Sequence, residues 1–383
     1  RGEYGCGKTF FARWLADKAR KLGFATSEVQ ISETETPLYR LETVYRRMNE
    51  RLATSDSFDG AFRNIIDAWF YTLEQDILAE GEVAETDEAQ LLIKTNELLE
   101  NRLASLGDTA QTFSLALRGY RRAQAENDLP TADGIAAWLA GQPNVAAAAK
   151  RYAGIKGEID HFGALTCLQG ILSILRDSGF SGLLLVLDEV ETIQRMRGDV
   201  REKSLNALRQ MIDEIDSGRF PGLYLLITGT TAFYEGPQGI KRLEPLAQRL
   251  HVDFQTDARF DNPRAPQIRL PPFDLERLCA VGVRIRDIFA LHADNAARIR
   301  ELCDDGYIRQ FAEAVAGRLG GKVGIAPRIF LKKLVGDVLD RIDQFADFDP
   351  RKHYALTIDD SELTTVERST TAASDVDNID LNL

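Results

Sequence analysis

The stretch GEYGCGKT at residues 2–9 decides the expected fold. It fits the pattern G-x-x-x-x-G-K-[ST] through Gly2, Gly7, Lys8 and Thr9, and Gly5 adds backbone freedom inside the loop. Glycines let consecutive backbone N–H groups turn inward around phosphate oxygens. A helix that follows such a loop directs the positive end of its dipole to the same place. The stretch therefore predicts a phosphate-binding turn followed by a helix.

The residues of this turn have distinct expected roles. Lys8 supplies a positive charge for the β- and γ-phosphates of ATP, and Thr9 supplies a hydroxyl for Mg²⁺. We interpret Cys6 as a small filler residue, with a redox-sensitive thiol as the alternative. The residues expected to contact the nucleotide are Gly2, Gly5, Cys6, Gly7, Lys8, Thr9 and Phe10.

Composition indicates a soluble, cytoplasmic protein with a large core. The 383 residues are 44% hydrophobic, and the longest purely aliphatic run, LLLVL at 183–187, is far too short to cross a membrane. Four cysteines without metal-ligand spacing fit a reducing compartment and no zinc. The net charge of -12 argues against a surface coated with basic groups for nucleic acid. Seven acids lie in the last 25 residues: Asp359, Asp360, Glu362, Glu367, Asp375, Asp377 and Asp380.

The pattern along the chain predicts an α/β class with a parallel sheet. Residues 1–272 form the expected α/β domain, with a helical insertion at about 55–160, because that stretch is too long for a simple crossover. Residues 273–348 read as a helical lid, and residues 349–383 as an acidic tail that is poorly ordered. A strand normally precedes the glycine-rich turn, so we expect the chain to lack its first central strand.

A buried strand is expected at SGLLLVLDEVETI, residues 181–193, and it ends in two adjacent acids. A carboxylate pair at the end of a buried strand is costly unless a metal ion or water satisfies it. Asp188 is the candidate ligand of hydrated Mg²⁺, and Glu189 the candidate that polarises the attacking water. Glu191 reads as a helix-start acid, with a second catalytic group as the alternative.

Further candidates follow later strands and helices. The strand expected at GLYLLITGTTAF, residues 222–233, carries Thr228 as the sensor of γ-phosphate or water, with Thr230 second. Arg249 reads equally as a finger that reaches a neighbouring subunit's nucleotide and as a surface ion-pair residue. A last strand is expected within PRAPQIRLPPFD, residues 263–274. Arg328 lies at an expected helix start, where a bound triphosphate would offset its unfavourable interaction with the dipole, with a structural surface arginine as the alternative.

Two basic clusters are candidates for DNA contact, although charged runs are usually solvated. The first cluster comprises Arg195, Arg197, Arg201 and Lys203; the second, within the insertion, comprises Arg118, Tyr120, Arg121 and Arg122. Phosphate contact by either cluster would make DNA binding sensitive to salt.

The order of these motifs resembles that of the AAA+ ATPases, particularly the origin-recognition and transposon-regulator branch. The segments GEYGCGKTFF, LDEVETIQRMRGDVREKSLNALRQMIDEI, LITGTTAFYEGPQG, PLAQRL, NPRAPQIRLPPFDLERL and APRIFLKKLV are similar to the BrxD-type ATP-binding proteins of bacteriophage exclusion (BREX) systems. The resemblance implies an ATPase subunit that acts with other BREX proteins, including a methyltransferase and a helicase-like component, on phage or host DNA.

The resemblance also implies roles for individual residues. Lys8 and Thr9 match the Walker A positions, Asp188 and Glu189 the Walker B pair, Arg249 the arginine finger and Arg328 the second sensor. Thr228 replaces the asparagine that many AAA+ proteins have at the first sensor, and Thr231 stands where this family has proline. Two functions remain open: an ATP-hydrolysing oligomer or hetero-complex, and a nucleotide-gated scaffold with little turnover. A small-molecule kinase is a weaker third, without a recognisable acceptor site.

Overall fold

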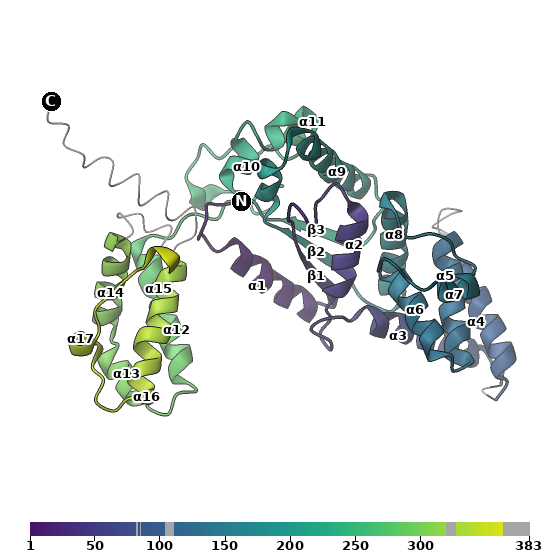
Figure 1. Cartoon of the computed structure of the whole chain (residues 1–383), viewed down its shortest axis with the longest axis horizontal. Helices are drawn as coiled ribbons and strands as arrows, with labels where there is room; N and C mark the ends of the chain where they lie inside the picture. The colour runs from purple at the N-terminus through teal and green to yellow at the C-terminus, as the bar shows by residue number, and fades with distance from the viewer. Residues whose placement is uncertain (82, 85, 104–110, 319–326, 363–383) are drawn as a thin grey trace. The chain divides into compact units, whose positions relative to one another are not determined.

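The computed structural model describes residues 1–81, 83–84, 86–103, 111–318 and 327–362 (Figure 1). The chain forms two compact units. The sheet unit comprises Thr9–Val252, and the helical unit comprises Arg1–Lys8 together with Asp253–Leu383. Most of the expected acidic tail, from Leu363 onward, lies outside the described residues.

The sheet unit contains a three-stranded parallel sheet in the order β1-β2-β3. The strands are β1 (Phe24–Gln30), β2 (Gly182–Asp188) and β3 (Leu223–Ile227). In the register of the ladder Gln30 lies opposite Asp188, and Leu187 lies opposite Ile227. The carboxyl ends of all three strands therefore meet at one edge of the sheet, and the fold is mixed α/β.

Strand β2 is buried along its whole length because helices cover both faces of the sheet. Leu184 and Val186 pack against Ala12 and Ala19 of α1 (Lys8–Lys21), which runs along one side of the strands in Figure 1. The intervening leucines join the main core on the opposite face. That core also takes side chains from α2 (Leu41–Glu50), α8 (His161–Asp177) and α9 (Gly198–Asp216).

A group of helices lies between β1 and β2 in the sequence and packs beside α8 (Figure 1). Its members after α2 are α3 (Phe62–Glu80), α4 (Glu88–Leu103), α5 (Gln111–Ala125), α6 (Leu129–Leu139) and α7 (Ala147–Ala153). The apolar stripe of α3, which includes Trp69 and Leu73, is buried in the same core as the sheet. Gly170 of α8 lets the ring of Phe113 approach the helix backbone.

Short elements complete the sheet unit after β2 and β3. They are η3 (Val190–Arg195), α10 (Thr231–Glu235), η4 (Ile240–Arg242) and α11 (Glu244–Arg249). The carboxyl end of the expected strand at 222–233 is thus helical from Thr231.

The helical unit has its own apolar core around Leu278, Ile308, Phe311, Phe330 and Leu334. Its elements are η5 (Ala258–Phe260), α12 (Leu275–Ala290), α13 (Ala296–Leu302), α14 (Asp305–Arg318), α15 (Pro327–Lys333), the π-helical η7 (Leu334–Leu339), α16 (Asp340–Gln344), α17 (Pro350–His353) and η8 (Asp360–Glu362). Asp274 caps α12 by accepting a hydrogen bond from the backbone N–H of Arg277.

Two stretches of the helical unit differ from the sequence-based expectation. Residues 263–274 contain no strand, and their prolines cannot donate ladder hydrogen bonds. Two backbone bonds tie this stretch to the start of the chain, from Leu270 N–H to Arg1 O and from the Arg1 amino group to Ile268 O. Residues 349–358 are also not an unpacked tail, because Tyr354, Leu356 and Ile358 pack against the helical core.

None of the helices among the described residues combines the length and the hydropathy that crossing a bilayer requires.

Candidate functional site

The glycine-rich turn has a backbone that only glycine adopts easily at two positions. Gly5 and Gly7 have φ values of 80° and 90°. A Cβ at Gly2 would overlap Cys6 Sγ and lie 2.8 Å from the Leu270 carbonyl oxygen. Burial raises the pKa of the Cys6 thiol, so Cys6 is protonated at neutral pH and packs as a small apolar group.

Lys8 and Phe10 follow this turn at the start of α1. The Lys8 ammonium group donates to the carbonyl oxygens of Gly2 at 3.0 Å and Glu3 at 3.2 Å. The chain thus holds the Lys8 charge against its own glycine-rich turn. Phe10 is 76% exposed, so its ring takes no part in the core. The ring is therefore accessible to a nucleotide.

Asp188 lies at the carboxyl end of β2 and accepts hydrogen bonds from two hydroxyl groups. Its Oδ2 accepts from Thr9 Oγ1 at 3.0 Å, and its Oδ1 accepts from Thr228 Oγ1. The side chain is 4% exposed and forms no ion pair in the part of the chain that the structure describes. A buried carboxylate surrounded by hydroxyls and lacking a protein cation is suited to a hard divalent cation such as Mg²⁺.

Glu189 directly follows Asp188 but is exposed, because the backbone changes direction there. Its φ of 58° and ψ of 41° are left-handed, which costs a residue other than glycine about 1 kcal/mol. The Glu189 N–H donates to Thr228 Oγ1 at 3.2 Å. Such strain in a non-glycine residue often marks a functional site.

Thr228 connects the two acids. It donates to Asp188, accepts from Glu189 N–H, and its side chain is 5% exposed. Thr230 is also buried, whereas Thr231 is the first residue of α10. Glu191, expected at a helix start, is 5% exposed within η3. The structure thus brings Thr9, Asp188, Glu189 and Thr228 together.

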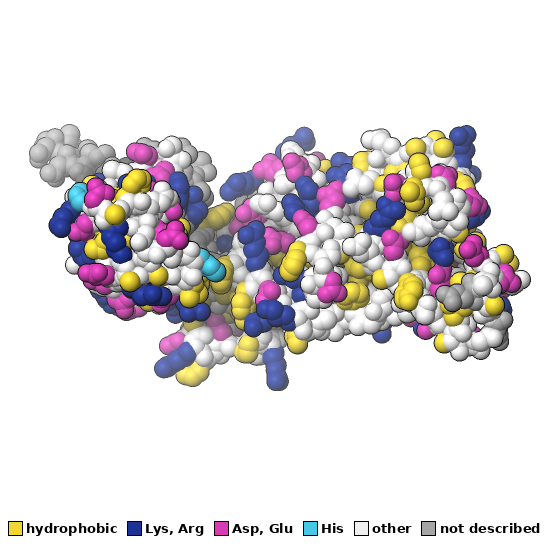
Figure 2. Space-filling model, turned by 90° about the horizontal axis from the view of Figure 1, so that it is seen from below, with side chains coloured by type: hydrophobic (Ala, Val, Ile, Leu, Met, Phe, Trp, Pro, Cys, Tyr) yellow, Lys and Arg dark blue, Asp and Glu magenta, His cyan; other side chains and the backbone are white. Residues whose placement is uncertain are grey.

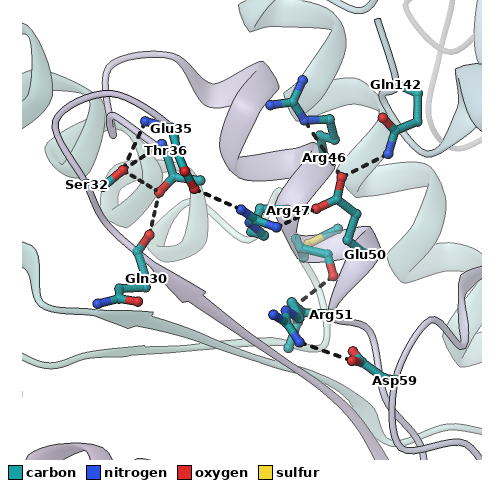
Figure 3. A network of polar contacts seen from close by, with 12 residues as sticks. Gln30, Ser32, Glu35, Thr36, Arg46, Arg47, Glu50, Arg51, Asp59 and Gln142 are labelled. Atoms are coloured by element: carbon teal, nitrogen blue, oxygen red, sulfur yellow. Dashed lines mark hydrogen bonds and ion pairs between the residues drawn. The ribbon is translucent and has the colours of Figure 1, made fainter.

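Gln30 is a residue of this site that the sequence analysis did not single out. Its side-chain amide donates to Glu189 Oε2 at 2.9 Å. Figure 3 shows how the end of β1 is held in place: the Thr36 hydroxyl donates to the Gln30 carbonyl oxygen, and Ser32 lies 3.3 Å from Thr36. Glu35 continues this network to Arg47 of α2 at 3.2 Å.

The two candidate arginines each contact residues of their own unit. Arg249 of α11 forms an ion pair with Asp213 of α9 at 2.6 Å and donates to Pro245 O, and its side chain is 39% exposed. Arg328 of α15 belongs to the helical unit, where its guanidinium donates to the Glu362 carbonyl oxygen at 2.6 Å.

Many of the basic side chains considered for DNA make internal contacts instead. Arg201 donates to the carbonyl oxygens of Gln194 and Met196 at the end of η3. In the insertion, Tyr120 is buried, and the arginines pair as follows: Arg118 with Glu100, Arg121 with Glu74 and Arg122 with Tyr152 O. Figure 2 shows Lys and Arg side chains interspersed with Asp and Glu on the face that it draws. Arg195, Arg197 and Lys203 remain exposed.

A cavity of about 550 Å³ beside β1 also carries arginines. Each of three of them pairs with an acid of the same cavity: Arg13 with Glu28, Arg47 with Glu35 and Arg51 with Asp59. The cavity therefore presents nearly balanced charge rather than a basic surface.

Of three comparisons with known proteins, one gives a match, to a protein family. No curated protein and no solved structure matches the chain. The family model for the BREX system ATP-binding protein BrxC/D matches residues 1–358, which confirms the resemblance read from the motifs. Since the match covers nearly the whole chain, this protein belongs to the BrxC/D family of BREX system ATP-binding proteins.

Proposed function

We propose that this protein is an AAA+-like ATPase subunit of a BREX defence system, in which the nucleotide state drives remodelling of DNA or of partner proteins. The observation that carries the proposal is the buried Asp188 carboxylate, which accepts from Thr9 and Thr228 next to the exposed, strained Glu189. Membership in a family of ATP-binding proteins supports the nucleotide.

Each residue of the site has a defined task in hydrolysis. Lys8 and the amides of the glycine-rich turn bind the phosphates, and Thr9 and Asp188 are the residues that would hold Mg²⁺. When bound, Mg²⁺ neutralises charge on the β- and γ-phosphate oxygens. Glu189 accepts the proton of the attacking water. Thr228 orients both acids through its single hydroxyl.

Hydrolysis in an assembly would require Arg249 to leave Asp213 and reach a neighbouring subunit's nucleotide. The pair is partly exposed, so releasing it costs little, about 1 kcal/mol or less. The assembly is a homo-oligomer or a hetero-complex with other BREX proteins. In the helical unit, Arg328 is the residue assigned to the nucleotide's phosphates.

A nucleotide-gated scaffold is the second candidate, and the contact of Gln30 favours it. The Gln30 amide occupies an oxygen of Glu189 that would otherwise accept the proton of water. If Gln30 restrains Glu189, Gln30→Ala raises turnover without changing ATP affinity. If Gln30 positions Glu189 for catalysis, the same change lowers turnover.

The test is ATP hydrolysis by the full chain across protein concentration, with and without DNA. Glu189→Gln should retain ATP binding and lose at least about 100-fold in turnover. Glu202→Gln, an exposed acid on α9, is the matched control. Lys8→Ala should lose ATP binding itself. Turnover by Glu189→Gln equal to that of wild type would exclude the proposed general base.

Arg249→Ala separates the two candidate functions. In an ATPase with a finger supplied in trans, turnover per subunit rises with protein concentration, and the variant loses this rise with ATP binding intact. A dilute monomer that hydrolyses ATP as fast as the concentrated protein would exclude the trans finger. Negligible turnover at all concentrations, with intact binding, supports the scaffold.

Where DNA is the substrate of the remodelling, Arg195, Arg197 and Lys203 are the exposed cations that would contact it. Replacing these three residues with glutamine should weaken DNA binding and flatten its dependence on salt. A DNA affinity that stays constant from low to high salt would exclude direct contact between these cations and DNA phosphates.

A further inference from the structure

The carboxylate of Glu362 is held by cations of a helix that lies about thirty residues earlier in the sequence. Its Oε1 accepts from Lys332 Nζ and its Oε2 from Lys333 Nζ, both at 2.9 Å. The Glu362 carbonyl oxygen accepts from Arg328 at 2.6 Å. We call Arg328, Lys332 and Lys333 the cation cluster; its three members lie on α15.

The segment that presents Glu362 is anchored by the residues that precede Glu362 in the chain. We call residues 354–362 the clasp. Tyr354, Leu356 and Ile358 pack against the helical core, and the Tyr354 hydroxyl donates to Asp337 at 3.1 Å. At its end the clasp closes a turn in which Glu362 N–H donates to Asp359 O and Asp359 N–H donates to Glu362 Oε2.

The donors around Glu362 are those that proteins use for phosphate. Two ammonium groups and a backbone N–H converge on one carboxylate whose side chain is 14% exposed. Lysine, arginine and backbone amides bind the oxygens of carboxylates and phosphates through the same charge-assisted hydrogen bonds. These contacts hold the pKa of Glu362 at about 2, so the carboxylate is charged at neutral pH. The carboxylate therefore stands where a phosphate group could bind.

We propose that the cation cluster is a binding site for phosphate oxyanions, and that Glu362 occupies this site as an internal ligand that a triphosphate displaces. The proposal rests on the proposed function, because Arg328 is the residue assigned there to the nucleotide. Arg328 donates to the Glu362 carbonyl oxygen in this structure, so its guanidinium must change partner to bind phosphate. Docking of the clasp and engagement of a triphosphate then exclude each other.

The charge balance favours such an exchange. The Glu362 carboxylate offers one negative charge to Lys332 and Lys333, and Arg328 contacts only the neutral Glu362 carbonyl oxygen, whereas a triphosphate carries several negative charges. Lys333 also has a second partner, Asp337 at 3.5 Å, which does not belong to the clasp. Lys332 is 59% exposed, so its contact with Glu362 opens readily to solvent and to competing anions. An undocked clasp would also release the turn between Asp359 and Glu362.

The first experiment measures hydrogen exchange of the clasp amides in the full chain. Inorganic tripolyphosphate is the probe, and the Lys8→Ala protein is measured beside wild type to exclude effects of the glycine-rich turn. Tripolyphosphate should accelerate exchange of the Asp359 and Glu362 amides several-fold in both proteins. Unchanged protection in both proteins, at probe concentrations that saturate any binding, would overturn the proposal.

The second experiment is a double-mutant cycle on ATP affinity. Glu362→Gln removes the charge at constant shape and should tighten ATP binding about three- to tenfold. In the Arg328→Ala background the same change should increase ATP affinity less, because the guanidinium for which Glu362 and the triphosphate compete is absent. Glu301→Gln, an exposed acid of α13 with no ion pair among the described residues, is the control. An equal gain in both backgrounds, or no gain, contradicts the exchange.

The two experiments separate this proposal from the proposed function. ATP binding that depends on Lys8 but not on Glu362 rejects the clasp alone. ATP binding that is insensitive to Lys8→Ala rejects the assigned nucleotide site, and the response of the clasp to tripolyphosphate in that variant still decides the second proposal.

Discussion

The Thr228 hydroxyl is expected to be the most consequential single contact of the site, and Thr228→Val tests it. Valine keeps the shape of threonine, so the change leaves no cavity. It removes the donor to Asp188 and the acceptor of Glu189 N–H, and both Thr228 and Asp188 are at most 5% exposed. A hydrogen bond to a charged group contributes about 1.5–3 kcal/mol.

We therefore expect Thr228→Val to lower the free energy of unfolding by about 2 kcal/mol. That is roughly a 30-fold change in the ratio of folded to unfolded protein. Urea unfolding followed by tryptophan fluorescence reports the unfolding of the unit that contains Thr228. The chain's three tryptophans, Trp14, Trp69 and Trp138, all lie in the sheet unit.

Thr228→Ser is the matched control, since it keeps the hydroxyl and loses only a methyl group. Thr228→Ser should lower the free energy of unfolding by less than half as much as Thr228→Val does. A valine variant whose unfolding free energy stays within about 0.5 kcal/mol of wild type would refute the reasoning, as would a serine variant that is equally destabilised.

Three further predictions concern other residues. Glu189→Gly removes the left-handed strain and should raise the unfolding free energy by about 1 kcal/mol while abolishing ATP hydrolysis; lower stability would contradict this. Gly170→Ala should cost about 1–3 kcal/mol in urea unfolding, because the new Cβ overlaps the Phe113 ring, whereas exposed Gly198→Ala meets no atom. The lowered pKa of Glu362 stabilises the folded state fully above pH 4.5, and this stabilisation is lost as the pH falls toward about 2. The thermal midpoints of wild type and Glu362→Gln should therefore differ by a constant amount above about pH 5 and become equal near pH 2.

The sheet and the paired acids were predictable because their signals are local. The run at 183–187, bounded by Gly182, indicates a strand buried on both faces, and the strand ends at Asp188 as expected. The strand expected within 263–274 is not formed among the described residues, where Ile268 O and Leu270 N–H bond to Arg1 and the stretch pairs with none of the three strands. The parallel sheet could therefore be anticipated, but its number of strands could not.

Gln30 and Glu362 were missed for a different reason: each acts through a partner distant in sequence. A glutamine at a strand end has no chemical signature of its own. Only the register, which sets Gln30 opposite Asp188, reveals that it can reach Glu189. Composition placed Glu362 in an acidic tail, whereas Tyr354, Leu356 and Ile358 carry the chain back onto the helical core. Non-local packing of this kind leaves little trace in one sequence.

The edge of β3 has a consequence for handling the protein. Among the described residues β3 pairs with β2 alone, and Tyr224 is 68% exposed on it. An exposed aromatic ring on an aliphatic strand can contact other molecules non-specifically, which leads to aggregates rather than to a ring of defined size. Tyr224→Lys would reduce this non-specific association through charge repulsion. Self-association that persists in the variant can therefore be attributed to a specific assembly.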